Sequence, residues 1–327
     1  MKRTLKRARW QRSAAAVAGL ALFVAACAGD DTDAETDTDA GVEEEVEETP
    51  ESEEEPEQDM SEDAGEPAAS GTLAELQEAG SITIGIANEE PYGFQNDEGE
   101  ITGEAPEVAR VVLGELGITE VNAEIVDFGA LIGGLQAGQF DMIAAGMYIN
   151  PERAEQILFS DPDYCVGEAF AVPEGNPAGL TDFTSVVDNP DVTIAILSGA
   201  VEEGYAEIAG VPAEQIELFS DVNAQYDALE AGRVDAVTGT SLTILNQIED
   251  REGFESTESF FPLDEDGEEI LGCGGFGFRN EDQELRDAFN DELNRLQDEG
   301  ELLPIIADFG FAEEDIERAQ ELTVEDF

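Results

Sequence analysis

The sequence contains no histidine and only three cysteines in 327 residues. Histidine is the side chain that most often serves as a general base or a metal ligand, so its absence argues against both kinds of chemistry. The cysteines, Cys27, Cys165 and Cys273, are too few and too far apart in the chain for a thiolate metal site. We therefore expect no metal, no cofactor and no enzymatic activity.

Positive charge is also scarce, with 14 Lys and Arg residues against 79 Asp and Glu residues. Six of the 14 basic residues lie within the first 26 positions, which leaves eight arginines in the rest of the chain. Nucleic acids and anionic membrane surfaces require clusters of Lys or Arg, so we expect neither as a partner. Molar salt shortens the electrostatic screening length to about 3 Å and makes such an acid excess tolerable. This favours a halophilic protein that folds in a salty exterior, with ordinary acidity as the alternative.

An apolar run at residues 14–26 follows the six basic residues and is too short for an ordinary transmembrane helix. Basic residues followed by such a run are typical of an export signal, which we assign to residues 1–26. LFVAAC, 22–27, resembles the lipobox of bacterial lipoproteins, in which the cysteine is acylated. We therefore expect Cys27 to be anchored in membrane lipid. A plain cleaved signal with an incidental cysteine is the alternative.

Residues 27–70 separate this signal from the rest of the chain. Twenty carboxylates lie between positions 30 and 66, and the segment has no aromatic residue. Such a composition cannot bury enough apolar surface to order the chain. We expect an acidic, disordered linker between the lipid anchor and a folded part, 71–327.

The folded part contains a diverged internal echo. LQAGQFDMIAAG, 135–146, and LEAGRVDAVTG, 229–239, share the pattern L-x-A-G-x-apolar-D-x-apolar. Each stretch predicts the end of a helix, closed by Gly138 or Gly232, followed by a short buried strand. The echo implies two lobes that are built alike.

Other patterns alternate between strands and helices. Runs at 82–86 and 191–197 predict strands, whereas 104–116 and 281–302 predict helices with one apolar face. These faces consist of Val108, Val111, Val112 and Leu116 in the first helix and Leu285, Phe289, Leu293 and Leu296 in the second. The class is therefore α/β. Since ligands gather at the carboxyl ends of parallel strands, near 146–148 and 238–240, we expect a binding site in a cleft between the lobes.

Stretches from about residue 80 to residue 327 resemble the extracellular solute-binding proteins of polar amino-acid-type ABC importers, family 3. They are IGIANEEPYGF (84–94), FDMIAAGMYINPERAEQILFSDPDY (140–164), GAVEEGYAE (199–207), ALEAGRVDAV (228–237) and GGFGFRNEDQELRDAFNDEL (274–293). Within the family, ANEEPY, TGEAPEVA, IAAGMYINPER, SDPDYCVGEAF and GAVEEGYA are most similar to the binding proteins for ectoine and hydroxyectoine.

This resemblance implies a two-lobed periplasmic-binding-protein fold of type II, with a hinge of two β-strands and the ligand in the interlobe cleft. Lobe 1 would be discontinuous, 71–164 plus 274–327, and lobe 2 would be 165–273. Cys165 and Cys273 would then lie on neighbouring hinge strands, where a disulfide is plausible outside the cell. Two buried free thiols are the alternative.

The resemblance also assigns ligand-binding roles. Arg153 would bind the ligand carboxylate, for which a guanidinium fork is well suited. Tyr92, Phe128 and Tyr148 would form an aromatic box around a delocalised cation. The remaining expected ligand-binding residues are Glu89, which would accept hydrogen bonds from ring N–H groups, together with Gly146, Val201, Glu202 and Thr240. Thr240 stands where binders of free amino acids carry an aspartate for the ammonium group, and main-chain N–H groups of Gly146 and of the 198–200 turn would meet the carboxylate.

The implied function is capture of a zwitterionic compatible solute, ectoine or hydroxyectoine, and its delivery to a membrane permease. The protein would be a monomer at the extracellular face of the membrane, lipid-anchored or periplasmic. A binder of another amino acid or of a betaine is the first alternative. A small-acid dehydratase on the same fold is the second, although the missing histidine and the lack of a paired nucleophile and base argue against it.

Overall fold

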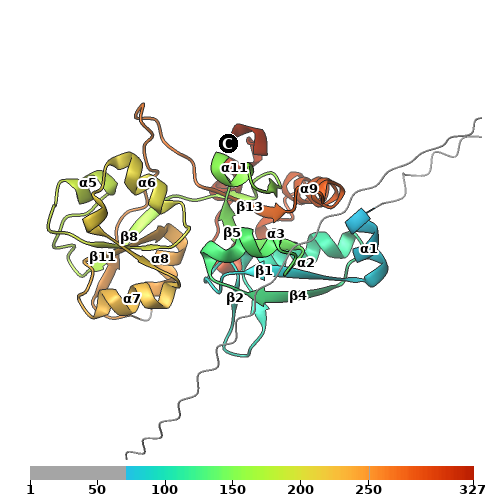
Figure 1. Ribbon diagram of the computed structural model, residues 1–327, viewed down its shortest axis with the longest axis horizontal. Coiled ribbons are helices and arrows are strands. Elements are labelled where there is room, and N and C mark those ends of the chain that lie inside the picture. The colour runs from blue at the N-terminus through green and yellow to red at the C-terminus, as the bar shows by residue number, and fades with distance from the viewer. Residues whose placement is uncertain (1–70, 250) are drawn as a thin grey trace, which may run out of the picture. The chain divides into compact units, whose positions relative to one another are not determined.

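The computed structural model describes residues 71–249 and 251–327 (Figure 1). The expected export signal, the acylation site at Cys27 and the expected linker lie outside the described residues. Within the described part, no helix combines the length and the apolar character that a membrane span requires.

The first of two main sheets combines strands from the two ends of the described chain. Its order is β4–β1–β5–β13–β6, and β7 also pairs with β13. β1 runs parallel to β4 and β5, whereas β13 runs antiparallel to β5, and Figure 1 shows this late strand beside the much earlier β5. The strands are β1 (Ser81–Ile86), β4 (Glu120–Ile125), β5 (Met142–Tyr148), β6 (Leu158–Phe159), β7 (Tyr164–Cys165) and β13 (Cys273–Phe278).

The second main sheet is built from the middle of the chain, in the order β10–β9–β11–β8–β12. β9 is parallel to β10 and β11, and β8 is antiparallel to β11 and β12. Its strands are β8 (Glu168–Pro173), β9 (Ile194–Leu197), β10 (Ile216–Phe219), β11 (Ala236–Thr240) and β12 (Phe254–Ser256); β9 begins three residues later than expected. A small separate sheet pairs β2 (Phe94–Gln95) with β3 (Ile101–Thr102).

The two sheets share a local plan, and this plan explains the internal echo. In each, one strand is flanked by two later parallel strands, and the next neighbour is antiparallel. Both echo glycines have positive φ, 69° at Gly138 and 65° at Gly232, which ends the preceding helix. The echo aspartates then accept equivalent bonds: Asp141 from the Thr83 amide (3.0 Å) and Asp235 from the Thr193 amide (2.8 Å). The repeated aspartate therefore ties each incoming strand to the neighbouring strand.

Helices cover these sheets, and most of the expected apolar faces are buried. The longer α-helices are α1 (Gly71–Ala79), α2 (Glu104–Glu115), α6 (Glu202–Ala209), α7 (Val222–Glu230), α8 (Ser241–Ile248), α9 (Gln283–Asp298) and α11 (Glu313–Gln320). The shorter ones are α3 (Leu131–Gln136), α4 (Pro151–Ala154), α5 (Phe183–Val187) and α10 (Leu303–Ile306). All four expected core residues of α9 are buried, as are Val108 and Val112 of α2. Val111 is 38% exposed, so the predicted face of α2 was too wide.

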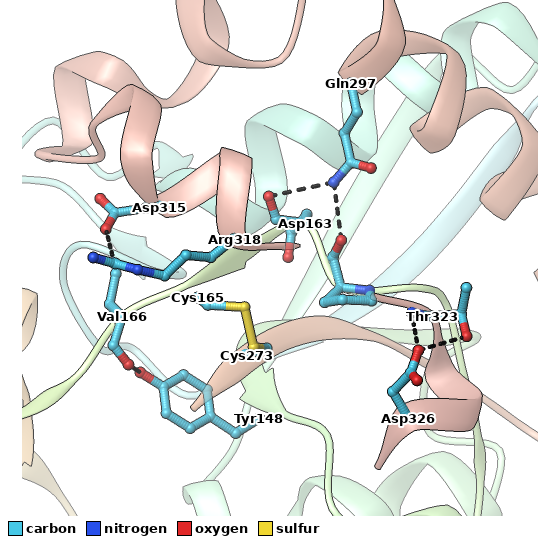
Figure 2. Close-up of a disulfide and its surroundings, with 11 residues drawn as sticks. Tyr148, Asp163, Cys165, Val166, Cys273, Gln297, Asp315, Arg318, Thr323 and Asp326 are labelled. Atoms are coloured by element: carbon cyan, nitrogen blue, oxygen red, sulfur yellow. Dashed lines mark hydrogen bonds and ion pairs between the residues drawn. A yellow bond between two sulfur atoms is a disulfide. The ribbon is translucent and has the colours of Figure 1, made fainter. Parts of the chain in front are cut away.

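The chain passes between the two sheets twice, after β7 and before β13, and a disulfide joins these passages. Cys165 and Cys273 face each other in the β7–β13 ladder and are bonded through sulfur (Figure 2). Both are buried together with Ala319 of α11. Nearby, the Tyr148 hydroxyl donates to the carbonyl of Val166 at 2.9 Å. Of the two alternatives, the disulfide is the one present.

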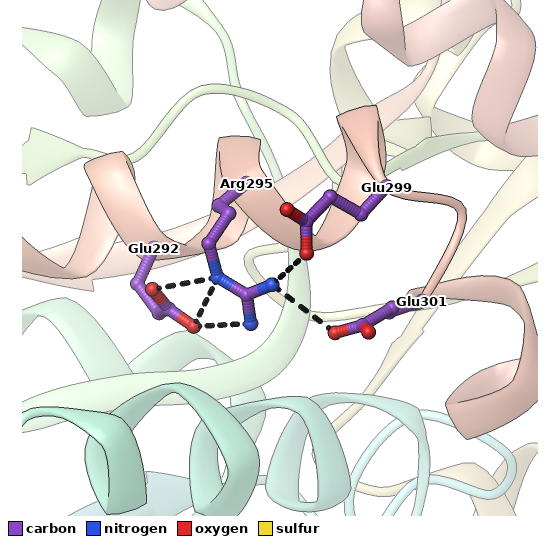
Figure 3. A network of polar contacts seen from close by, with 4 residues as sticks. All are labelled: Glu292, Arg295, Glu299 and Glu301. Atoms are coloured by element: carbon purple, nitrogen blue, oxygen red, sulfur yellow. Dashed lines mark hydrogen bonds and ion pairs between the residues drawn. The ribbon is translucent and has the colours of Figure 1, made fainter.

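The acid excess is visible locally at the end of α9. Arg295 contacts three carboxylates, those of Glu292, Glu299 and Glu301 (Figure 3). The Arg295 side chain is 37% exposed, so water screens these pairs strongly. One guanidinium among three carboxylates leaves a local negative charge, as the composition predicts.

Candidate ligand-binding site

A pocket lies where residues that follow strands of both sheets come together. Its empty volume is about 510 Å³, including space open to solvent. All nine expected ligand-binding residues line it: Glu89, Tyr92, Phe128, Gly146, Tyr148, Arg153, Val201, Glu202 and Thr240. They come from the segment after β1, a 3₁₀ turn (η1, Phe128–Ala130), β5, α4, the start of α6 and the end of β11. The fold thus collects residues that span positions 89 to 240.

The local sequence around Arg153 places its side chain in the pocket. Asn150 caps α4 by accepting a bond from the Arg153 amide at 2.8 Å, and Pro151 occupies the first turn. The guanidinium donates from Nη1 to the Tyr148 carbonyl (2.6 Å) and from Nη2 to the Gly199 carbonyl (2.9 Å). Only 6% of Arg153 is exposed.

The charge of this guanidinium has little local compensation. Among the described residues no carboxylate forms an ion pair with Arg153, so the alternative of a surface pair with Glu152 or Asp161 does not apply. Burial lowers the pKa of Arg153, and the charge of Glu202 partly opposes that effect. The two bonds to carbonyls use two of its five N–H groups. The site therefore holds a buried cation with donors to spare for an anion.

Two of the three expected aromatic residues lie on glycine backbone. A Cβ added at Gly146 would come within 2.3 Å of the Tyr92 ring, and one at Gly272 within 2.2 Å of the Tyr148 ring. Any larger residue at either position would displace these rings. Phe128 is placed differently, because the Arg153 guanidinium lies 5.5 Å from its ring centroid. All three rings line the pocket, and Phe128 already has a cation on its face.

Two carboxylates face the pocket from different parts of the fold. Glu89, after β1, accepts a bond from the Thr243 hydroxyl of α8 at 2.7 Å. Burial raises the pKa of Glu89 to about 7; the bond from Thr243 opposes this rise and the charge of Glu202 adds to it. Glu202, in the first turn of α6, is 5% exposed, and burial raises its pKa while Arg153 opposes the rise.

Sequence reasoning missed Thr243 and Glu168. Thr240 caps α8 by accepting from the Thr243 amide, so a helix start was legible in TSLTILNQI, but its approach to Glu89 was not. Glu168 does not line the pocket; it is 1% exposed and contacts the carboxyl group of Glu202. Nothing in the sequence distinguishes it from other acids.

The expectation that amides of the 198–200 turn would meet a ligand carboxylate was wrong for this structure. The Ser198 amide donates to Phe219 and the Ala200 amide to Leu197, both to carbonyl oxygens, and the Gly199 amide donates to the Glu203 carboxylate at 2.6 Å. The turn contributes the Gly199 carbonyl, which accepts from Arg153. In the part of the chain that the structure describes, no group of acids and cysteines is arranged to hold a metal ion.

Comparison with known proteins supports a solute-binding site. The model of the bacterial extracellular solute-binding proteins, family 3, matches residues 82–311. A probable amino-acid ABC transporter periplasmic-binding protein of Sinorhizobium fredii is 35% identical over 251 residues, covering 76% of this chain and 83% of that protein. The crystal structure of EhuB in complex with hydroxyectoine is similar with a TM-score of 0.71 and 36% identity, covering 78% of this chain and 96% of that chain.

The two-sheet α/β architecture has the same parentage. An ancestral amino acid-binding protein, a precursor of cyclohexadienyl dehydratase, has a TM-score of 0.63 at 24% identity over 73% of this chain and 99% of that chain, which shows the fold alone. The expected type II periplasmic-binding-protein fold is confirmed. The chain belongs to the bacterial extracellular solute-binding proteins of family 3 and is the substrate-binding subunit of an amino-acid-type ABC importer.

Proposed function

We propose that the pocket binds ectoine or hydroxyectoine, zwitterions that combine a carboxylate with a cationic tetrahydropyrimidine ring. The observation that carries the proposal is one buried guanidinium, Arg153, that shares a pocket with the carboxyl groups of Glu89 and Glu202. The ligand carboxylate would take the free N–H groups of Arg153. The ring N–H groups would donate to Glu89 and Glu202, so one molecule would satisfy all three side chains.

Aromatic residues support a delocalised cation rather than a compact ammonium. A cation over a ring gains about 0.5 to 2 kcal/mol, more when water is excluded. Because Phe128 already faces Arg153, Tyr92 and Tyr148 are the rings that we expect to contribute most to ligand binding. Similarity to a structure that holds hydroxyectoine favours the same choice.

We further propose that residues 71–164 plus 274–327 and residues 165–273 act as two lobes that close around the ligand. Two hydrogen bonds join them across the pocket, from Arg153 to the Gly199 carbonyl and from Thr243 to Glu89. A ligand that contacts both lobes would shift the population toward the closed form. That form would dock on a membrane permease, with the protein held as a monomer at the extracellular face through acylated Cys27.

Two alternatives make different demands on the same pocket. Glycine betaine could occupy the aromatic residues and Arg153, but it has no N–H group for Glu89 or Glu202. A free amino acid would place a compact ammonium near Thr240, which already bonds Thr243 as the cap of α8. A dehydratase would need a general acid or base, and the buried carboxyl of Glu89 is the pocket group whose pKa of about 7 best suits that role.

Calorimetric titration of the full chain in molar salt tests the proposal. Ectoine, hydroxyectoine, glycine betaine and a panel of amino acids would be titrated separately. We expect tight one-to-one binding of the first two and weaker binding of betaine. Silent ectoines together with a tightly bound amino acid would refute the proposed specificity, and turnover of a small acid would support the dehydratase alternative.

A further inference from the structure

Glu168 is a buried acid whose environment the pocket alone does not explain. It begins β8, where its amide donates to the Phe260 carbonyl (2.7 Å) and its carbonyl accepts from the Phe260 amide (2.9 Å). These bonds fix its backbone. Only 1% of the residue is exposed, and neither carboxyl oxygen accepts a bond from an N–H or O–H donor of the described residues.

The carboxyl group of Glu168 instead contacts that of Glu202. Two ionised carboxylates offer only acceptors, so a bond between them requires a proton on one of them. Leaving both charges buried and unpaired would be strongly unfavourable. The contact therefore indicates that the two acids share one proton.

The surroundings decide which acid carries the proton. Glu202 receives the charge of Arg153 and a bond from its own amide, and both favour its ionised form. Glu168 is faced by Glu202 and Tyr205 from α6, by Glu89 and Tyr92 from the segment after β1, and by Tyr148 from β5. None of these groups is a cation, and burial together with the charge of Glu202 raises the pKa of Glu168 well above its ordinary value.

We propose that Glu168 is a positioning residue: its protonated carboxyl donates to Glu202 from behind the pocket wall and holds the Glu202 carboxylate in place for the ligand. Glu202 lines the pocket and one of its oxygens has no donor among the described residues, whereas Glu168 does not line it. The proton thus leaves a single ionised carboxylate on this side of the pocket. For the identity of the ligand, the inference rests on the proposed function.

The test compares Glu168→Gln with Glu168→Leu in the full chain in molar salt. The amide of Gln keeps a donor for Glu202 without a titrating proton, whereas Leu removes the donor. We expect the Gln variant to bind ectoine within about threefold of the unchanged protein at pH 7. The Leu variant should bind about tenfold or more weakly, as expected for loss of one hydrogen bond to a charged group.

A second measurement needs no ligand. A native acid with a raised pKa stabilises the fold below its unfolded pKa, and this stability is lost as pH rises toward the native pKa. The melting temperature of the unliganded protein should therefore fall between pH 6 and 9, and the fall should be shallower in Glu168→Gln. The matched control is Glu104→Gln, because Glu104 forms a similar buried contact with Asp163 outside the pocket. It should also flatten the melting profile but leave ectoine binding unchanged.

The outcomes separate the two proposals. If the unchanged protein ignores ectoine but Glu168→Gln still flattens the melting profile, the shared proton stands and the ligand assignment fails. The positioning role is overturned if Glu168→Leu binds like the unchanged protein. It is overturned equally if the melting temperature of Glu168→Gln falls with pH as steeply as before.

Discussion

Replacing Arg153 with alanine separates the binding role of this residue from its structural role. The guanidinium bonds two carbonyls, and the one on Gly199 lies on the opposite side of the pocket from Tyr148. Leaving a buried carbonyl without its donor costs about 1 to 3 kcal/mol, so the unliganded protein should lose stability of that order. Loss of a buried charge pair with a ligand carboxylate costs about 2 to 5 kcal/mol. Affinity for ectoine should therefore fall by a factor on the order of 30 to several thousand.

The assay is calorimetric titration combined with thermal unfolding of the same samples, and Arg233→Ala is the matched control. Arg233 also lies over a phenylalanine ring, 5.2 Å from the centroid of Phe219, but its side chain is 57% exposed and its partner Glu217 is 41% exposed. An exposed pair contributes about 0 to 1 kcal/mol, so this variant should bind normally. Ectoine affinity within about threefold of the unchanged protein in folded Arg153→Ala would contradict the reasoning.

Three further predictions concern pH, lobe contact and salt. Because the pKa of Glu89 is about 7 and a cationic ring favours its ionised form, ectoine affinity should rise with pH up to about 7 and then level off, and Glu89→Gln should abolish the rise. A Cβ at Gly129 would lie 2.9 Å from the Ser198 carbonyl oxygen, so Gly129→Ala should weaken ligand binding, whereas Gly133→Ala in α3, with no atom within 4 Å of the added Cβ, should not; equal titrations would contradict this. The melting temperature should fall when salt is lowered from molar to about 0.1 M, where the screening length grows from about 3 to about 10 Å. An unchanged melting temperature would refute the halophilic hypothesis.

Residue patterns were sufficient for features that depend on neighbours along the chain. The echo around Gly138 and Gly232 predicted two similar helix-to-strand units because a helix end and a buried strand leave local signals. The family motifs indicated which residues to expect in the pocket, and the nine expected residues do line one pocket. Their roles in binding remain predictions.

Other features were beyond the sequence because they depend on which segments meet. Periodicity alone assigned Val111 to the core, although the neighbouring elements leave it exposed. The pairing of Cys165 with Cys273 was left open until β7 and β13 were found side by side.

The sequence by itself determined the α/β class, the family and the acid excess, since these follow from composition, periodicity and motifs. Only the tertiary structure decided that the 198–200 turn offers a carbonyl to Arg153 rather than amides to a ligand. It alone distinguished Glu168 from the other 78 acids, by burying its carboxyl against Glu202. The physical reason is that desolvation and hydrogen-bond pairing depend on distances between segments far apart in the chain, which no local pattern encodes.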